Sequence, residues 1–151
     1  MAKFKMGDYK TIKIRSYIDV QEEHRAAVAG IMPGMFVTYG TPANGEIPVT
    51  NAGTAGTVPN PLFVVTEDEL QGKTILDAYA EGDPIQCWMP TRGDIVLASV
   101  ANTQTIAVGA KLTVDAKGQV TVTATGNTVI GTALTAITTT TEPGFVQVLI
   151  G

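Results

Sequence analysis

Alternation of apolar and polar residues marks the clearest strand of the sequence, in the C-terminal third of the chain. In QVTVTAT, residues 119–125, valine and alanine alternate with threonine, which is the period-two pattern of a half-buried strand. Similar short apolar runs between turn residues predict further strands at 35–39, 62–65, 84–89, 95–100, 105–114, 129–137 and 145–150. The pattern predicts a mainly β domain, either a small β-barrel or a sandwich.

Capping and turn signals predict one short helix and one tight hairpin. Residues 66–69, TEDE, have the spacing of a capping box, in which the Thr66 hydroxyl accepts a hydrogen bond from the Glu69 amide. Gly72 would end this helix after one or two turns. Gly118, in DAKG, stands where a short hairpin loop often needs a positive φ.

The chain divides into a basic arm and one folded body. A length of 151 residues fits a single domain. Residues 1–16 are predicted to form an extended basic N-terminal arm, and residues 17–151 a single β-rich domain. Within that domain residues 41–61 are crowded with Gly, Pro, Asn and Thr, which predicts a long surface loop with brief strand pieces.

Composition and charge narrow the choice of partner. The chain is 44% hydrophobic and 16% charged, with 16 Gly and 8 Pro, a balance that favours many short strands. The first 15 residues hold half of the ten basic residues and one acidic residue, giving +4, while the remainder carries −8. A net charge of −4 gives no reason to expect nucleic acid as a direct partner. No secretory signal or membrane-spanning apolar run is present, so we expect cytoplasmic synthesis and no membrane contact.

Residues with catalytic potential are few. His24 is the single histidine, in EEHR, and is interpreted as a solvated or ion-paired surface residue. Cys87 is the single cysteine, which excludes an internal disulfide or a multi-cysteine metal site and predicts a core thiol. Trp88 follows it, so in a strand one of the two is expected to face inward and the other outward. The RGD tripeptide at 92–94 is a weak adhesion signal. We expect no enzyme, no cofactor and no metal.

A resemblance to a known family covers about residues 61–150. It is carried by LFVVTEDELQGKTILDAYAEGDPIQCWMPTRGDIVLASV, then VGAKLTVDAKGQV, then VIGTALTAITTTTEPGFVQVLI. In this order the segments resemble capsid decoration (cement) proteins of tailed bacteriophages. The resemblance implies a β-tulip or barrel body with an N-terminal arm along the shell. It also implies a structural virion protein, made in the host cytoplasm, that attaches as homotrimers to the outside of the head and bridges capsomers of the major capsid protein.

The contact residues are a hypothesis drawn from charge. We expect the basic arm to dock on an acidic capsid surface, with apolar anchors among the lysines, through Lys3, Phe4, Lys5, Met6, Lys10, Ile12, Lys13 and Arg15. The 41–61 loop is a second candidate contact. One alternative is a ligand- or carbohydrate-binding β-module of a phage spike or adhesion structure, which predicts an exposed aromatic platform at Trp88 and nearby tyrosines. A third interpretation, a hydrolase, would depend on His24.

Overall fold

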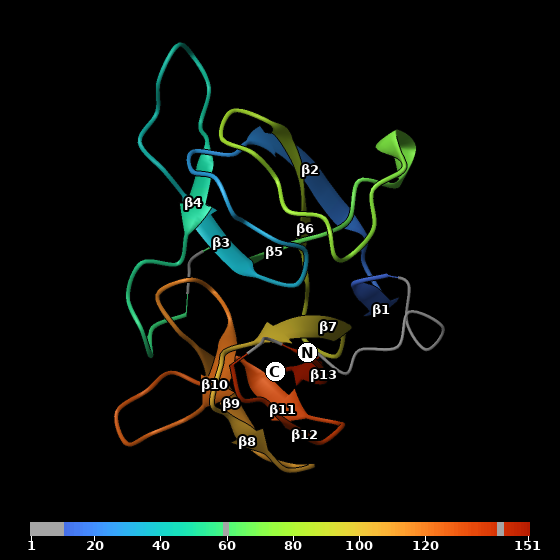
Figure 1. Cartoon of the computed structure of the whole chain (residues 1–151), viewed down its shortest axis with the longest axis vertical. Helices are drawn as coiled ribbons and strands as arrows, with labels where there is room; N and C mark the ends of the chain where they lie inside the picture. The colour runs from blue at the N-terminus through green and yellow to red at the C-terminus, as the bar shows by residue number, and fades with distance from the viewer. Residues whose placement is uncertain (1–10, 59–60, 142–143) are drawn as a thin grey trace.

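Two large β-sheets contain most of the strands that the structure describes. The computed structural model describes residues 11–58, 61–141 and 144–151. Within these ranges the regular structure is almost entirely β, as predicted, and the two main sheets have the strand orders β2-β6-β5-β3-β4 and β1-β7-β10-β9-β11-β13. Figure 1 shows the first sheet in the upper half of the view and the second below it, with β1 at the level between them.

The strands are short. The upper sheet consists of β2 (Val20–Arg25), β3 (Phe36–Tyr39), β4 (Val49–Asn51), β5 (Phe63–Val65) and β6 (Pro84–Met89). The lower sheet consists of β1 (Lys13–Arg15), β7 (Ile95–Val100), β9 (Lys111–Val114), β10 (Val120–Val122), β11 (Gly131–Ala133) and β13 (Gly144–Ile150). A separate pair is formed by β8 (Thr105–Ile106) and β12 (Ile137–Thr138).

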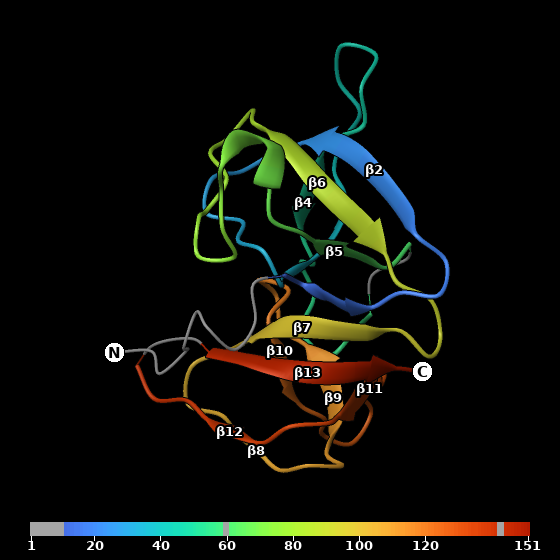
Figure 2. The same cartoon turned by 90° about the vertical axis from the view of Figure 1, so that its right-hand side faces the viewer.

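The lower sheet closes into a barrel, which decides between the barrel and the sandwich. β7 pairs with β13 in antiparallel register from Val100 opposite Gly144 to Ile95 opposite Leu149. β7 also pairs in parallel with β10, so β7, β10, β9, β11 and β13 form a closed ring. Figure 2 shows β7 and β13 side by side on the barrel wall nearest the upper sheet. Closure removes the unpaired edges that would otherwise recruit other strands.

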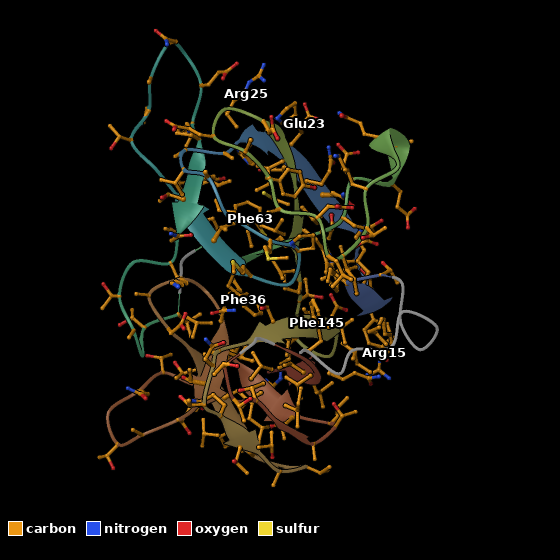
Figure 3. All side chains as sticks on the ribbon, in the orientation of Figure 1. Arg15, Glu23, Arg25, Phe36, Phe63 and Phe145 are labelled. Carbon is orange, nitrogen blue, oxygen red and sulfur yellow. The ribbon has the colours of Figure 1, made fainter. Side chains whose placement is uncertain are left out.

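Alternation along the upper strands gives the protein two apolar cores. Phe36, Val64 and Trp88 point toward the barrel and join the cluster that fills it. Phe63 and Cys87 belong to a second cluster enclosed by the upper sheet. Figure 3 places Phe36 between the sheets and Phe63 within the upper one. The expectation that one of Cys87 and Trp88 faces outward is wrong, because β6 is covered on both faces and both side chains are fully buried.

The turn before β10 connects the two sheets through a backbone hydrogen bond. Gly118 has φ +89, as predicted, and its carbonyl accepts a 2.8 Å hydrogen bond from the Phe36 amide. A Cβ at position 118 would lie 1.9 Å from the Phe36 carbonyl oxygen. Glycine is therefore required here by the backbone conformation and by the close approach of the upper sheet.

The predicted capping box is wrong. The helix is a single 3-10 turn, η1 (Glu69–Gln71), with Asp68 at its N-cap and no capping side-chain hydrogen bond, although Gly72 ends it in the left-handed conformation. Tertiary contacts hold the preceding residues extended instead. The Thr66 carbonyl accepts a 2.7 Å hydrogen bond from the Tyr79 hydroxyl, and the Glu67 carboxylate accepts one from the Ile12 amide at 3.2 Å. No helix therefore begins at Thr66, and the turn that does form starts after Asp68.

Residues 41–58 contain both exposed and docked parts. The connection from β3 to β4 is exposed over residues 41–47 and turns at Asn44 and Gly45, both with positive φ. After β4 the chain lies against the barrel, where the Gly53 amide donates to the Ala116 carbonyl and the Gly56 amide to the Val114 carbonyl. This second part links the upper sheet to the β9–β10 hairpin.

Candidate interaction surface

The residue that precedes β1, Ile12, is part of the folded body. The Ile12 side chain is fully buried in the cluster shared by the two sheets. Its carbonyl accepts a hydrogen bond from the Leu97 amide at 2.9 Å, and its amide donates to the Glu67 carboxylate. Ile12 is therefore a core residue of the folded body, not a free contact residue. Five of the predicted contact residues lie outside the described residues: Lys3, Phe4, Lys5, Met6 and Lys10.

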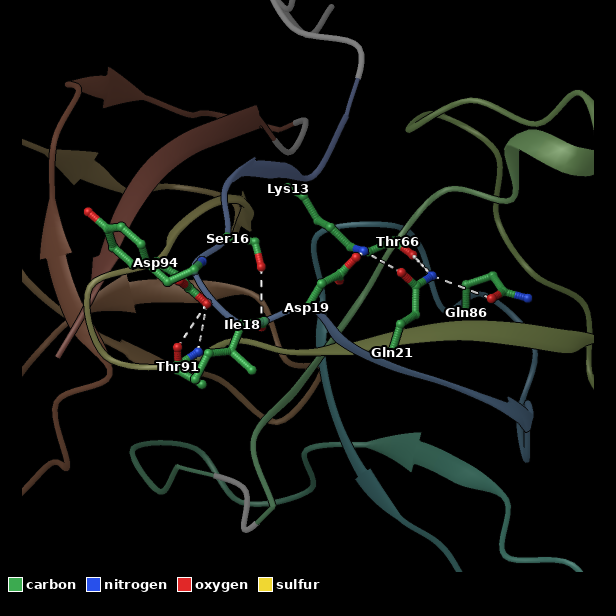
Figure 4. A network of polar contacts seen from close by, with 10 residues as sticks. Lys13, Ser16, Ile18, Asp19, Gln21, Thr66, Gln86, Thr91 and Asp94 are labelled. Atoms are coloured by element: carbon green, nitrogen blue, oxygen red, sulfur yellow. Dashed lines mark hydrogen bonds and ion pairs between the residues drawn. The ribbon is translucent and has the colours of Figure 1, made fainter.

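Lys13 is held by Asp19, just before β2, and by Gln21 on β2. Its ammonium lies 2.6 Å from Asp19 Oδ1, also donates to Gln21 Oε1, and sits 5.8 Å from the centroid of the Trp88 ring. Figure 4 shows this network continuing through Gln21 to Thr66 and Gln86. An ammonium with these partners is oriented by the fold.

Arg15 is the more exposed of the two described basic residues on β1. Its guanidinium donates to the Gly93 carbonyl at 2.8 Å and stacks over the Tyr17 ring, 5.1 Å from its centroid. Tyr17 is 67% exposed and Ile18 beside it is 59% exposed. The structure thus brings a cation, an aromatic ring and an aliphatic side chain together at the β1–β2 corner. The sequence Ser16-Tyr17-Ile18 contains no pattern that predicts the exposure of Tyr17 and Ile18.

The aspartate of the RGD tripeptide stabilises the β1–β2 corner. Asp94 is fully buried, and its carboxylate accepts hydrogen bonds from the amides of Tyr17 and Thr91, both at 2.8 Å. Figure 4 shows the contacts between Asp94 and Thr91. An aspartate committed in this way is not presented to a receptor.

Charge is divided between the two halves of the molecule. Residues 16–89, which include the upper sheet, carry ten acidic and two basic residues, whereas residues 90–151 carry three of each. The −8 charge beyond the arm therefore belongs to the upper half, and the threonine-rich barrel half is neutral. A recess lined by Glu67, Asp68 and Glu69 opens on the acidic half, beside β1.

The described residues show no catalytic arrangement. The His24 ring nitrogens lie 2.8 Å from the Glu22 carboxylate and 2.9 Å from the Ile47 carbonyl, and the ring packs edge-on to Tyr39 and Phe63. Burial raises the pKa of the Cys87 thiol to about 12, which keeps it protonated and unreactive. No three His, Cys, Asp or Glu residues in the described part of the chain are placed to hold a metal ion. None of its helices is long and apolar enough to span a membrane.

Comparison with known protein families identifies the family to which the chain belongs. The family model for phage cement proteins matches residues 26–150. The chain belongs to the phage cement protein family. Membership assigns it a structural, capsid-associated role and makes it a component of the virion, in agreement with the resemblance of residues 61–150.

A solved structure shares the fold of this cement-family chain. The N base of head fiber gp8.5 in bacteriophage phi29 aligns with a TM-score of 0.60 and 19% identity, over 89% of this chain and 95% of that chain. At this identity the likeness shows a common fold. No curated protein sequence matches the chain significantly.

Proposed function

We propose that this protein binds the outer surface of a phage head and stabilises the mature shell by bridging neighbouring capsomers of the major capsid protein. The observation that carries the proposal is the match to the cement family over residues 26–150. Function then depends on surface contacts repeated over many copies.

The basic arm is the proposed contact. Lys3, Lys5 and Lys10 supply charge, Phe4 and Met6 supply apolar area, and Arg15 continues the basic surface onto the folded body. Each exposed ion pair contributes about 0–1 kcal/mol. Assembly into a homotrimer would make the second and third arm contacts effectively intramolecular and raise the total affinity. Light scattering of the purified protein tests the trimer.

The arm contact is tested by cosedimentation with heads from which the protein has been stripped. One variant changes Lys3, Lys5 and Lys10 to Gln. The matched control changes Arg92, Lys111 and Lys117 to Gln, which removes the same charge from the barrel half. The arm variant should bind fewer copies, with the largest loss at low salt, where charge contacts are least screened. Equal binding by the two variants would reject the arm as the contact.

A second candidate is a ligand- or carbohydrate-binding module of a spike or adhesion structure. The shared fold with a head fiber base favours it. Trp88 is fully buried and cannot form the aromatic platform, which leaves Tyr17 and Tyr39, 67% and 38% exposed, among the described residues. Glycan binding by the isolated protein, with no binding to heads, would support this function over the first.

A further inference from the structure

An acidic recess of about 320 Å³ lies between the start of β1, β2 and the segment that follows β5. Its walls carry three carboxylates, from Glu67, Asp68 and Glu69, and one ammonium, from Lys13. Leu70, on its rim, is 98% exposed. Figure 4 shows one wall, where Lys13 and Gln21 approach Thr66 and Gln86. The recess therefore combines excess negative charge with an apolar edge.

Asp68 lacks the counter-charge that a buried carboxylate needs. It is only 7% exposed, and no hydrogen bond or ion pair joins its carboxylate to a described residue. It also borders a neighbouring recess of about 270 Å³ that contains Asp77 and Asp83. Burying an ionised carboxylate without a partner costs free energy, so such groups normally meet a cation or several donors.

The charged groups around Asp68 are already committed to other partners. The Lys13 ammonium contacts Asp19 and Gln21, and Glu67 accepts the Ile12 amide through Oε2. Asp68 contributes its backbone carbonyl to the amides of Gln71 and Lys73, which leaves the carboxylate unpaired. The Asp68 carboxylate is therefore left available to solvent or to a group from outside the described part of the chain.

We propose that the recess binds a lysine or arginine side chain of a protein partner, with the cationic group against Asp68 and Glu67 and the alkyl stem along Leu70. Charge complementarity favours a cation, and the apolar rim favours one carried on a hydrocarbon stem. A metal ion fits less well, because no three carboxylates among the described residues are arranged to coordinate one. This inference adds a specific contact to the proposed function. It depends on that function only for identifying the partner as a capsid protein.

The test is a titration of the full-length, nitrogen-15-labelled protein followed by backbone amide NMR. The probe is Nα-acetyl-lysine methylamide, and the control probe is its Nε-acetylated form, which has the same stem and no charge. Saturable shifts are expected for residues 66–70 with the charged probe alone, at affinities on the order of millimolar for a single side chain. The Asp68→Asn variant should bind about tenfold more weakly, because it loses one partner of the charge pair.

Glu81→Gln is the matched control, because Glu81 is exposed and lies outside the lining of the recess. It should bind the probe as the parent protein does. Asp68→Asn removes an unpaired buried charge, so it is expected to fold; Glu69→Gln, at an exposed position on the same recess, provides a second variant that should weaken binding. Unchanged affinity in both recess variants overturns the proposal.

Three other results would also overturn it: equal shifts with the uncharged probe, displacement of the lysine probe by calcium at the same amides, or binding that is seen only after residues 1–10 are removed. The last result would assign the recess to the chain's own arm. The titration contains no phage component, so its failure leaves head binding untouched. Conversely, if the protein bound the probe but did not bind heads, the recess proposal would stand and the proposed function would be rejected.

Discussion

Replacing Ile12 with alanine tests where the arm ends and the folded body begins. Ile12 is fully buried in the core cluster shared by both sheets, although it lies in the segment that the sequence assigned to an arm. Ile18 lies six residues further on and is 59% exposed. The pair therefore offers the same substitution, in the same segment, at opposite extremes of burial.

The expected magnitudes differ widely between the two sites. Truncating a fully buried isoleucine costs about 2–5 kcal/mol, because it removes apolar contacts and leaves a cavity. A chain of this size loses roughly 2–4 °C in Tm per kcal/mol, so Ile12→Ala should lower Tm by about 4–20 °C. Ile18→Ala should change stability by less than about 0.5 kcal/mol, as surface substitutions generally do.

Urea unfolding followed by tryptophan emission gives both values directly. Trp88 is the only tryptophan and is fully buried between the sheets, so its emission should shift when the core opens. Thermal melts by circular dichroism provide the independent check on Tm. Equal midpoints for Ile12→Ala and Ile18→Ala would refute the docking of β1, and the arm would then extend through residue 15.

Further predictions concern Gly118, Cys87 and Tyr79. Gly118→Ala should destabilise the protein by more than about 2 kcal/mol, because it adds backbone strain and a clash with Phe36; Gly72→Ala, with φ +73 and no atom within 4 Å of the new Cβ, should cost less in the same urea assay. Cys87 should not react with Ellman's reagent near neutral pH until urea unfolds the protein; a rapid native reaction would contradict its burial. Because burial raises the pKa of Cys87 from 9.0 to about 12, its contribution to stability is complete below pH 9 and is lost as the pH rises toward 12; Cys87→Ala should flatten that decline. Tyr79→Phe should cost about 1 kcal/mol in thermal melts, since the Thr66 carbonyl loses its 2.7 Å partner, and an unchanged Tm would count against this contact.

Local patterns predicted the strands well because alternation is a property of neighbouring residues. The apolar run at 145–150 lies within β13, whereas the threonine–valine repeat at 119–125 forms a strand only over Val120–Val122, where Val120 is buried and Val122 is exposed. Gly118 adopts the positive φ that its hairpin requires. Barrel closure depends on pairing β7 with β13, which lie more than 40 residues apart. Alternation within either strand contains no information about that partner.

Errors arose where tertiary contacts overrode a local signal. Residues 66–69 have the capping-box spacing, yet contacts from Tyr79 and Ile12 hold Thr66 and Glu67 extended. Trp88 was expected to alternate with Cys87 between core and surface, but a second core covers the other face of β6. The unpaired state of Asp68 and the exposure of Tyr17 depend on distant segments, so the sequence could not reveal them.

The charge division was visible in the sequence, but its place in the fold was not. The +4 of the first 15 residues and the −8 of the remainder are compositional facts. The structure adds that the negative charge belongs to the upper half and that the barrel half is neutral. The acidic recess also opens beside the strand that leads out of the arm.

A cryo-electron microscopy reconstruction of purified mature heads tests the central claim most directly. The account predicts density that fits the barrel and the upper sheet on the outer surface of the shell, at positions that join neighbouring capsomers, and loss of this density from heads assembled without the protein. Mature heads that contain no copy of the chain, or that carry it only inside the shell, would contradict the account.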